Sequence, residues 1–164
     1  MLSSSYQKTT PIRASKIVHK SYILHPQARF VNEEVVCLIF GINFEDIYTV
    51  ECWCYIVYVH GKGVSRFVSY ADFPPIIGVG LPTARDRLKW RKRWSKSYDY
   101  RQKQYAPDWW AEFLHIQFSQ ATSEYDLQRW WHLLSLINFA FTNSILQQLQ
   151  HSYQSKREGA GSRR

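Results

Sequence analysis

Apolar and polar positions in the first half of the chain follow patterns that are typical of β-strands. Val35–Phe40 is a short apolar run rich in branched residues and is followed by Gly41, which predicts a buried strand. Tyr48–Val59 alternates and is apolar on both faces, so we expect one central strand that is covered on each side. His60–Gly63 then predicts a hairpin loop, with Val64–Tyr70 as the partner strand.

The pattern changes to a helical one after a segment rich in proline and glycine at residues 71–82. We expect helices over residues 84–96, 108–120 and 124–150. Residues 128, 132, 135, 138 and 142 form one narrow polar stripe on the third helix, which predicts that most of its surface is buried. The predicted fold class is α+β: an antiparallel β meander of three to four strands, followed by about three helices packed on it.

The ends of the chain lack such periodicity. We expect residues 1–20 to form a flexible basic arm, residues 21–154 to form a single α+β domain, and residues 155–164 to form a disordered basic tail. Within the domain, Tyr22–Phe30 predicts a short strand that is interrupted by Pro26.

Composition excludes several classes of protein. The 164 residues include 7 Trp, 11 Tyr and 9 Phe, enough apolar surface to offset the entropy of folding. Met1–Lys8 is polar and serine-rich, unlike a secretory signal, and no run of about 18 apolar residues predicts a membrane span. Without a spanning segment, we expect no membrane partner. Three cysteines, an odd number, do not suggest a disulfide framework, so we expect a cytoplasmic protein.

Positive charge is concentrated in one segment of the chain. The net charge is +8, and residues 81–104 carry nine basic and two acidic groups. Cations there alternate with aromatic residues, a pattern that suits phosphate contacts and stacking on unpaired bases. The candidate nucleic-acid-binding residues are Arg85, Arg87, Lys89, Trp90, Arg91, Lys92, Arg93, Trp94, Lys96, Tyr98, Arg101 and Lys103.

The aromatic residues of this segment have a second interpretation. Trp90, Trp94 and Tyr98 recur at every fourth position, so a helix places them on one face. That face can dock on the sheet and support the surface while the cations stay in solvent. The sequence leaves both interpretations open.

Other candidate motifs are incomplete. Cys52 and Cys54, with Cys37 and His60 elsewhere, supply zinc-ligand chemistry, but the one-residue spacing is shorter than structural zinc sites use. We therefore interpret the cysteines as buried thiols and expect no metal. Gly78-Val-Gly80 lacks the further glycine or lysine of a nucleotide-binding loop, so we predict a turn and no cofactor.

Residues 105–141 contain the segment Tyr105-Ala-Pro-Asp-Trp-Trp-Ala-Glu112, and Tyr125–Leu134 follows it. The first segment resembles the Tyr-x-x-Arg-Trp-x-x-Glu segment in the C-terminal part of IS4-like DDE transposases, and the second is similar to the helix that follows it in that family. The resemblance implies that Glu112 is the third metal-binding acid. Asp108 stands where the family has arginine and Ser119 where it has lysine, and the first two acids cannot be assigned. The resemblance thus implies a truncated or degenerate relative from a mobile element.

These observations favour a small basic protein that binds DNA or RNA by contacting phosphates through its Lys/Arg/aromatic segment. One alternative is a protein–protein interaction subunit of a larger complex, with exposed aromatic residues at the interface. The other is the transposase-related protein. No complete catalytic motif is present, and Glu112 is a catalytic candidate only under the transposase interpretation.

Overall fold

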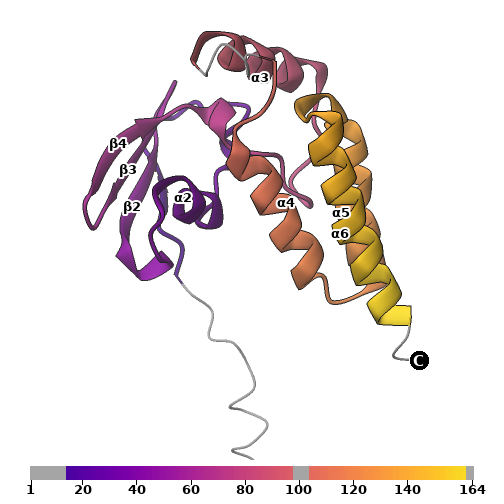
Figure 1. The fold of residues 1–164 in the computed structure, drawn as a ribbon. Coiled ribbons are helices and arrows are strands. Elements are labelled where there is room, and N and C mark those ends of the chain that lie inside the picture. Colours follow the sequence, from indigo (N-terminus) through magenta and orange to yellow (C-terminus); the bar gives the residue numbers. More distant parts are fainter. Residues whose placement is uncertain (1–13, 98–103, 162–164) are drawn as a thin grey trace, which may run out of the picture.

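The computed structural model describes residues 14–97 and 104–161. The described part confirms the α+β class: it has a four-stranded sheet with one α-helix between its first two strands, and the other α-helices follow the last strand (Figure 1). The strands are β1 (Ile17–His19), β2 (Ile47–Cys52), β3 (Val57–Gly61) and β4 (Val64–Val68). The α-helices are α2 (Glu33–Phe40), α3 (Ala84–Ser97), α4 (Asp108–Gln120), α5 (Glu124–Leu136) and α6 (Asn143–Gly161). Four described 3-10 turns complete the elements: η1 (Ala28–Phe30), η2 (Phe44–Asp46), η3 (Tyr70–Asp72) and η5 (Asn138–Ala140).

The sheet is mixed. Its strand order is β1-β2-β3-β4, in which β1 runs parallel to β2 and the other neighbours are antiparallel. The parallel strand β1 lies within residues 1–20, which the sequence assigned to a flexible arm, and Val50 N–H donates to the Lys16 carbonyl beside it. The helices lie on one side of the sheet and α3 lies across one end, so the other side of the sheet faces solvent (Figure 1).

The hairpin between β3 and β4 is confirmed, and it explains one glycine. β3 and β4 pair from Val57 opposite Val68 to Gly61 opposite Val64. A Cβ built on Gly61 would lie 2.6 Å from the Asp46 carbonyl oxygen, so the close approach of these two backbone segments requires glycine.

The prediction of a strand at Val35–Phe40 is wrong, because these residues form most of α2. The Asn32 side chain accepts a hydrogen bond from Val35 N–H at the start of the helix. Gly41 ends the helix with a left-handed φ of 65°. These end signals outweigh the modest strand preference of β-branched residues.

The single strand predicted for Tyr48–Val59 is also wrong. The chain reverses at residues 53–56, where Trp53 N–H donates to the Ile56 carbonyl, so the segment forms β2 and β3. The turn holds no glycine or proline, and it therefore left no turn signal in the sequence. The strand predicted at Tyr22–Phe30 is absent; among these residues only η1 is regular.

The predicted third helix is two helices. α5 ends at Leu136 and α6 begins at Asn143, where the Thr142 hydroxyl accepts from Ile145 N–H. α6 then continues through residues 155–161, which the sequence assigned to a disordered tail. The predicted helices at 84–96 and 108–120 are confirmed by α3 and α4.

One hydrophobic core joins the inner face of the sheet to the helices. Its largest fully buried side chains include Trp90, Trp94, Trp110, Phe30 and Phe73. Within the described part of the chain, no helix is long and apolar enough to cross a membrane.

Candidate nucleic-acid interface

The basic segment begins with a capped helix. Thr83 and Asp86 form a reciprocal pair: Thr83 Oγ1 accepts from Asp86 N–H at 3.2 Å, and Asp86 Oδ2 accepts from Thr83 N–H at 2.9 Å. This capping box satisfies backbone donors at the start of α3 and explains why the helix begins here.

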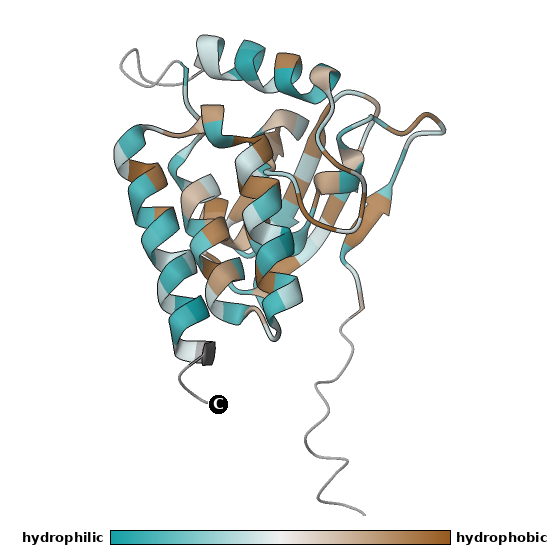
Figure 2. Cartoon of the chain, turned by 90° about the vertical axis from the view of Figure 1, so that its right-hand side faces the viewer, coloured by the Kyte–Doolittle hydropathy of each residue, from teal (hydrophilic) through white to brown (hydrophobic). Residues whose placement is uncertain are grey.

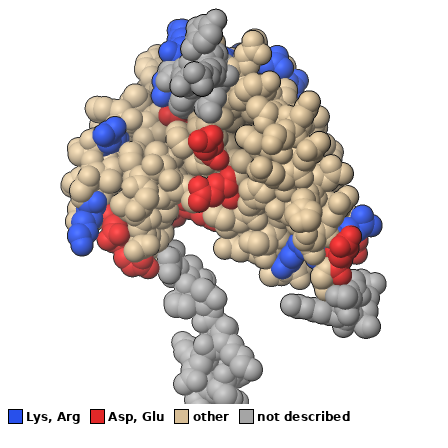
Figure 3. All heavy atoms as spheres, viewed as in Figure 1, with Lys and Arg blue, Asp and Glu red and all other residues tan. Residues whose placement is uncertain are grey.

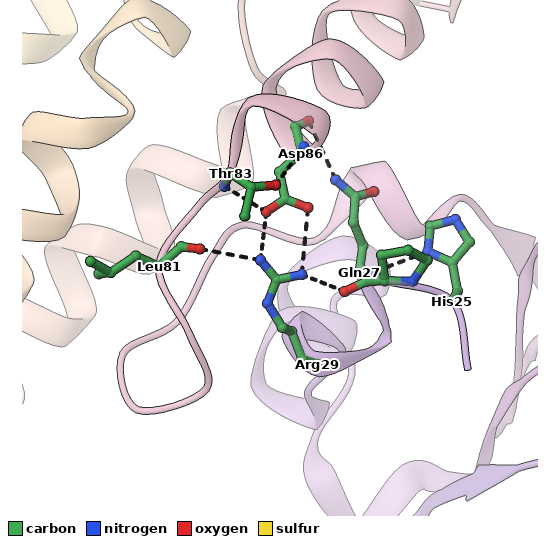
Figure 4. Close-up of polar contacts among 7 residues, drawn as sticks. His25, Gln27, Arg29, Leu81, Thr83 and Asp86 are labelled. Atoms are coloured by element: carbon green, nitrogen blue, oxygen red, sulfur yellow. Dashed lines mark hydrogen bonds and ion pairs between the residues drawn. The ribbon is translucent and has the colours of Figure 1, made fainter. Parts of the chain in front are cut away.

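Asp86 is also the centre of a polar cluster that holds α3 against η1 (Figure 4). The Arg29 guanidinium bridges the Asp86 carboxylate at 2.5 Å and donates to the carbonyls of Pro26 and Leu81. Gln27 is 1% exposed and donates from Nε2 to the Asp86 carbonyl at 3.4 Å. Burial alone raises the pKa of the Asp86 carboxyl, but hydrogen bonds from Arg29 and Thr83 outweigh burial and hold the pKa below its ordinary value.

A second ion pair anchors the middle of the same helix. Arg93 Nε lies 3.2 Å from Oδ1 of Asp72, and the Asp72 carbonyl accepts from the indole N–H groups of Trp109 and Trp110 at 2.9 Å each. The half-exposed Arg93 side chain is therefore paired with a buried carboxylate of the protein itself. It is less available to a ligand than the sequence pattern suggested.

The tryptophans of the basic segment lie in the core. Trp90 and Trp94 are both 0% exposed, and each packs edge-on against Trp110 with ring centroids 5.2 Å apart. The expectation that these rings stack on bases is thus wrong, because neither offers a face to solvent. The structure supports the second interpretation in that this face of α3 is buried, but the two rings pack on Trp110 of α4 rather than on the sheet.

The cations of α3 differ in their surroundings. Arg85, Arg91, Lys92 and Lys96 are exposed, whereas Arg87 and Lys89 are half-buried. The Arg91 guanidinium lies over the ring of Phe139, 4.6 Å from its centroid. Figure 3 shows Lys and Arg side chains over α3, whereas most acidic side chains on that face lie below it. The candidates Tyr98, Arg101 and Lys103 lie outside the described residues.

The three lysines of α3 converge on a pocket of about 220 Å³, which we call the basic pocket. Lys89, Lys92, Arg93 and Lys96 line it from α3, and His25, Gln27, Tyr55 and residues 69–71 line it from the other side. No acidic side chain is among these lining residues. The spacing of Lys89, Lys92 and Lys96 places their amines on one helix face, where they can share one anionic ligand.

His25 forms part of the wall of this pocket. Its ring stacks on Tyr70, with centroids 4.1 Å apart and planes 9° apart, and its Nδ1 accepts from Gln27 N–H at 3.0 Å. Burial, and next the positive charge of Lys89, lower the pKa of His25 to about 4, although Asp86 opposes the shift. The ring is therefore neutral at pH 7, and the accepted bond at Nδ1 leaves its proton on Nε2.

Tyr55 is the aromatic side chain that the pocket leaves open to solvent. It lies in the turn between β2 and β3 and is 86% exposed. The sequence placed Tyr55 inside a central strand, so it was missed as a candidate. Tyr55 becomes a candidate only once the turn at residues 53–56, which exposes its side chain, is known.

The remaining candidates do not form a second site in the described residues. Cys37 in α2, Cys52 in β2 and Cys54 in the turn at residues 53–56 are free thiols. No group of three or more His, Cys, Asp or Glu side chains described here can hold a metal ion. Glu112 is exposed on α4.

Comparison of this chain with protein-family models, with curated proteins and with solved structures finds no match.

Proposed function

We propose that this protein binds nucleic acid at the basic pocket. The observation that carries the proposal is the convergence of Lys89, Lys92 and Lys96 on one pocket that has no acidic lining residue. Lysine amines at this spacing can neutralise neighbouring phosphates, and release of the condensed counterions then favours binding.

Base contact in this proposal comes from Tyr55 rather than from the tryptophans. Tyr55 is exposed and lines the same pocket as the lysines, so one ring can stack on a base while a neighbouring phosphate meets the amines. Trp90 and Trp94 support the surface from beneath by fixing the orientation of α3.

Fluorescence anisotropy with labelled DNA and RNA, measured over a range of salt concentrations, tests this proposal. We expect wild-type affinity to fall steeply as salt rises, and the double variant Lys92→Glu/Lys96→Glu to bind at least about tenfold more weakly at low salt. Its salt slope should also decrease by about 0.7 for each phosphate of a single strand that the variant no longer neutralises.

The matched control is Lys62→Glu/Arg157→Glu, which changes the net charge equally at exposed positions away from α3. Equal losses of affinity in the two double variants would show that net charge alone drives binding and would refute the claim that nucleic acid binds at the basic pocket. Absence of binding by the wild type at low salt would refute the proposed function itself.

The outer face of the sheet favours a second candidate, an interaction subunit of a larger complex. Tyr58 and Phe67 pair across β3 and β4 with ring centroids 5.2 Å apart, and Phe67 is exposed. Aromatic side chains on such faces are enriched at protein interfaces. A partner recovered with the wild type should be lost with Phe67→Asp; equal recovery with both would contradict this candidate.

A further inference from the structure

Two loops that carry exposed apolar residues lie at the same end of the sheet. β1 and β2 are parallel, with His19 opposite Cys52, so the chain leaves both strands in the same direction. The first loop holds Tyr22, Ile23 and Leu24, and the second is the turn at residues 53–56. Lys20 N–H donates to the Cys52 carbonyl at 2.9 Å, which ties the beginnings of the two loops together.

Side-chain contacts also join the far end of the first loop to the second. His25 stacks on Tyr70, and the Tyr70 hydroxyl donates to the Trp53 carbonyl. The two loops therefore form one continuous surface, which we call the apolar tip. Its exposed side chains are Tyr22, Ile23, Leu24, Trp53, Tyr55 and Ile56.

The first loop of the apolar tip projects from the protein. Figure 2 shows the loop after β1 projecting from the body of the protein, with hydrophobic residues at its end. The side chains of the consecutive residues Ile23 and Leu24 are 74% and 58% exposed to solvent. Adjacent aliphatic side chains held away from the body in this way fit a deformable apolar phase better than a flat partner surface.

Positive charge lies next to the apolar tip. Lys20 precedes the first loop, and Lys89, Lys92 and Lys96 line the basic pocket that Tyr55 shares. The acidic group in contact with the tip is Glu51, whose Oε1 accepts from the Trp53 indole N–H at 3.1 Å. Lys20 and the three lysines of the basic pocket favour an anionic partner.

We infer that the apolar tip docks on the surface of a bilayer that contains anionic lipid. Ile23 and Leu24 insert among the acyl chains, Trp53 and Tyr55 lie at the interface, and the lysines contact lipid phosphates. Trp and Tyr have amphipathic rings that favour this depth. The expectation of no membrane partner rested on the absence of a spanning segment, and a docked loop requires none.

Flotation of the protein with phosphatidylcholine vesicles, prepared with and without phosphatidylserine, tests the inference. We expect binding only when phosphatidylserine is present, and a loss of about tenfold or more in Ile23→Asp/Leu24→Asp. The control is Tyr48→Asp/Tyr125→Asp, which places the same charges at exposed aromatic positions elsewhere and should bind as the wild type does.

The variants also separate this inference from the proposed function. Ile23→Asp/Leu24→Asp should weaken vesicle binding more than nucleic-acid binding, whereas Lys92→Glu/Lys96→Glu should weaken both kinds of binding. Equal flotation of Ile23→Asp/Leu24→Asp and the wild type would overturn the docking role of the tip, as would absence of wild-type flotation. Neither result would affect a salt-dependent affinity for nucleic acid. Circular dichroism of each variant shows that it is folded before the comparison is made.

Discussion

The contacts of the Asp86 carboxylate give an expected cost in stability for its removal. Asp86→Ala removes both the acceptor of the capping box and the partner of Arg29. Loss of the helix-start hydrogen bond costs about 1 kcal/mol. Loss of the charge-assisted bonds to Arg29 costs about 2 kcal/mol, because Asp86 is buried while the Arg29 side chain stays partly exposed to solvent. We expect the free energy of unfolding to fall by about 3 kcal/mol in total.

Urea denaturation followed by tryptophan fluorescence measures this change, since Trp90 lies on the same helix. A double-mutant cycle of Asp86→Ala with Arg29→Met isolates the ion pair, and we expect a coupling free energy of about 1.5 kcal/mol. A coupling free energy near zero would refute the argument that Arg29 stabilises the protein through Asp86.

The pH dependence of stability gives an independent check of the direction in which the pKa of Asp86 is shifted. The folded-state pKa of Asp86 is lowered, so its stabilising contribution is fully present above the unfolded-state pKa of about 3.9. That contribution is lost as pH falls through the lower folded-state value. The stability difference between the wild type and Asp86→Asn should therefore be constant near neutral pH and shrink in acid; a difference that grows in acid would contradict the lowered pKa.

Three further predictions follow from particular contacts. Gly61→Ala should lower the free energy of unfolding by about 1–3 kcal/mol in urea denaturation, because its Cβ would meet the Asp46 carbonyl; an unchanged midpoint would contradict this. Cys52 is buried and burial raises its pKa, so iodoacetamide should label it more slowly at neutral pH than Cys54, as mass spectrometry of peptides will show. Tyr55→Ala should weaken single-stranded nucleic-acid binding by about 1–3 kcal/mol yet leave the urea midpoint within about 0.5 kcal/mol of wild type; equal affinity would exclude stacking.

Local signals in the sequence account for the helical half of the fold. Pro107-Asp108 and the cap at Ser123 mark the starts of α4 and α5, and both helices begin where the sequence predicts. Asn32 and Gly41 carry the same kind of signal, but the branched residues between them led to the prediction of a strand that ends at Gly41. A tertiary contact lies where α5 is divided from α6: Ala106 N–H donates to the carbonyl of Ala140, which lies between the two helices.

The candidate site divides in the same way. Sequence spacing placed Trp90 and Trp94 on one face of a helix but left open whether that face is buried or stacks on bases, and the structure shows that it is buried. Which face is buried depends on Trp110, which comes from a different helix. The position of Arg93 against Asp72 and the presence of His25 in the pocket likewise depend on residues far away in the sequence.

By itself the sequence determined the α+β class, the positions of α3 and α4, and the concentration of positive charge in one helix. These properties are local, because caps, periodicity and charge spacing act over a few residues. Only the tertiary structure decided that β1 joins the sheet, that the chain turns at residues 53–56, and that Tyr55 and His25 meet the lysines of α3. Those outcomes depend on which distant surfaces bury one another, and no local pattern of residues encodes that choice.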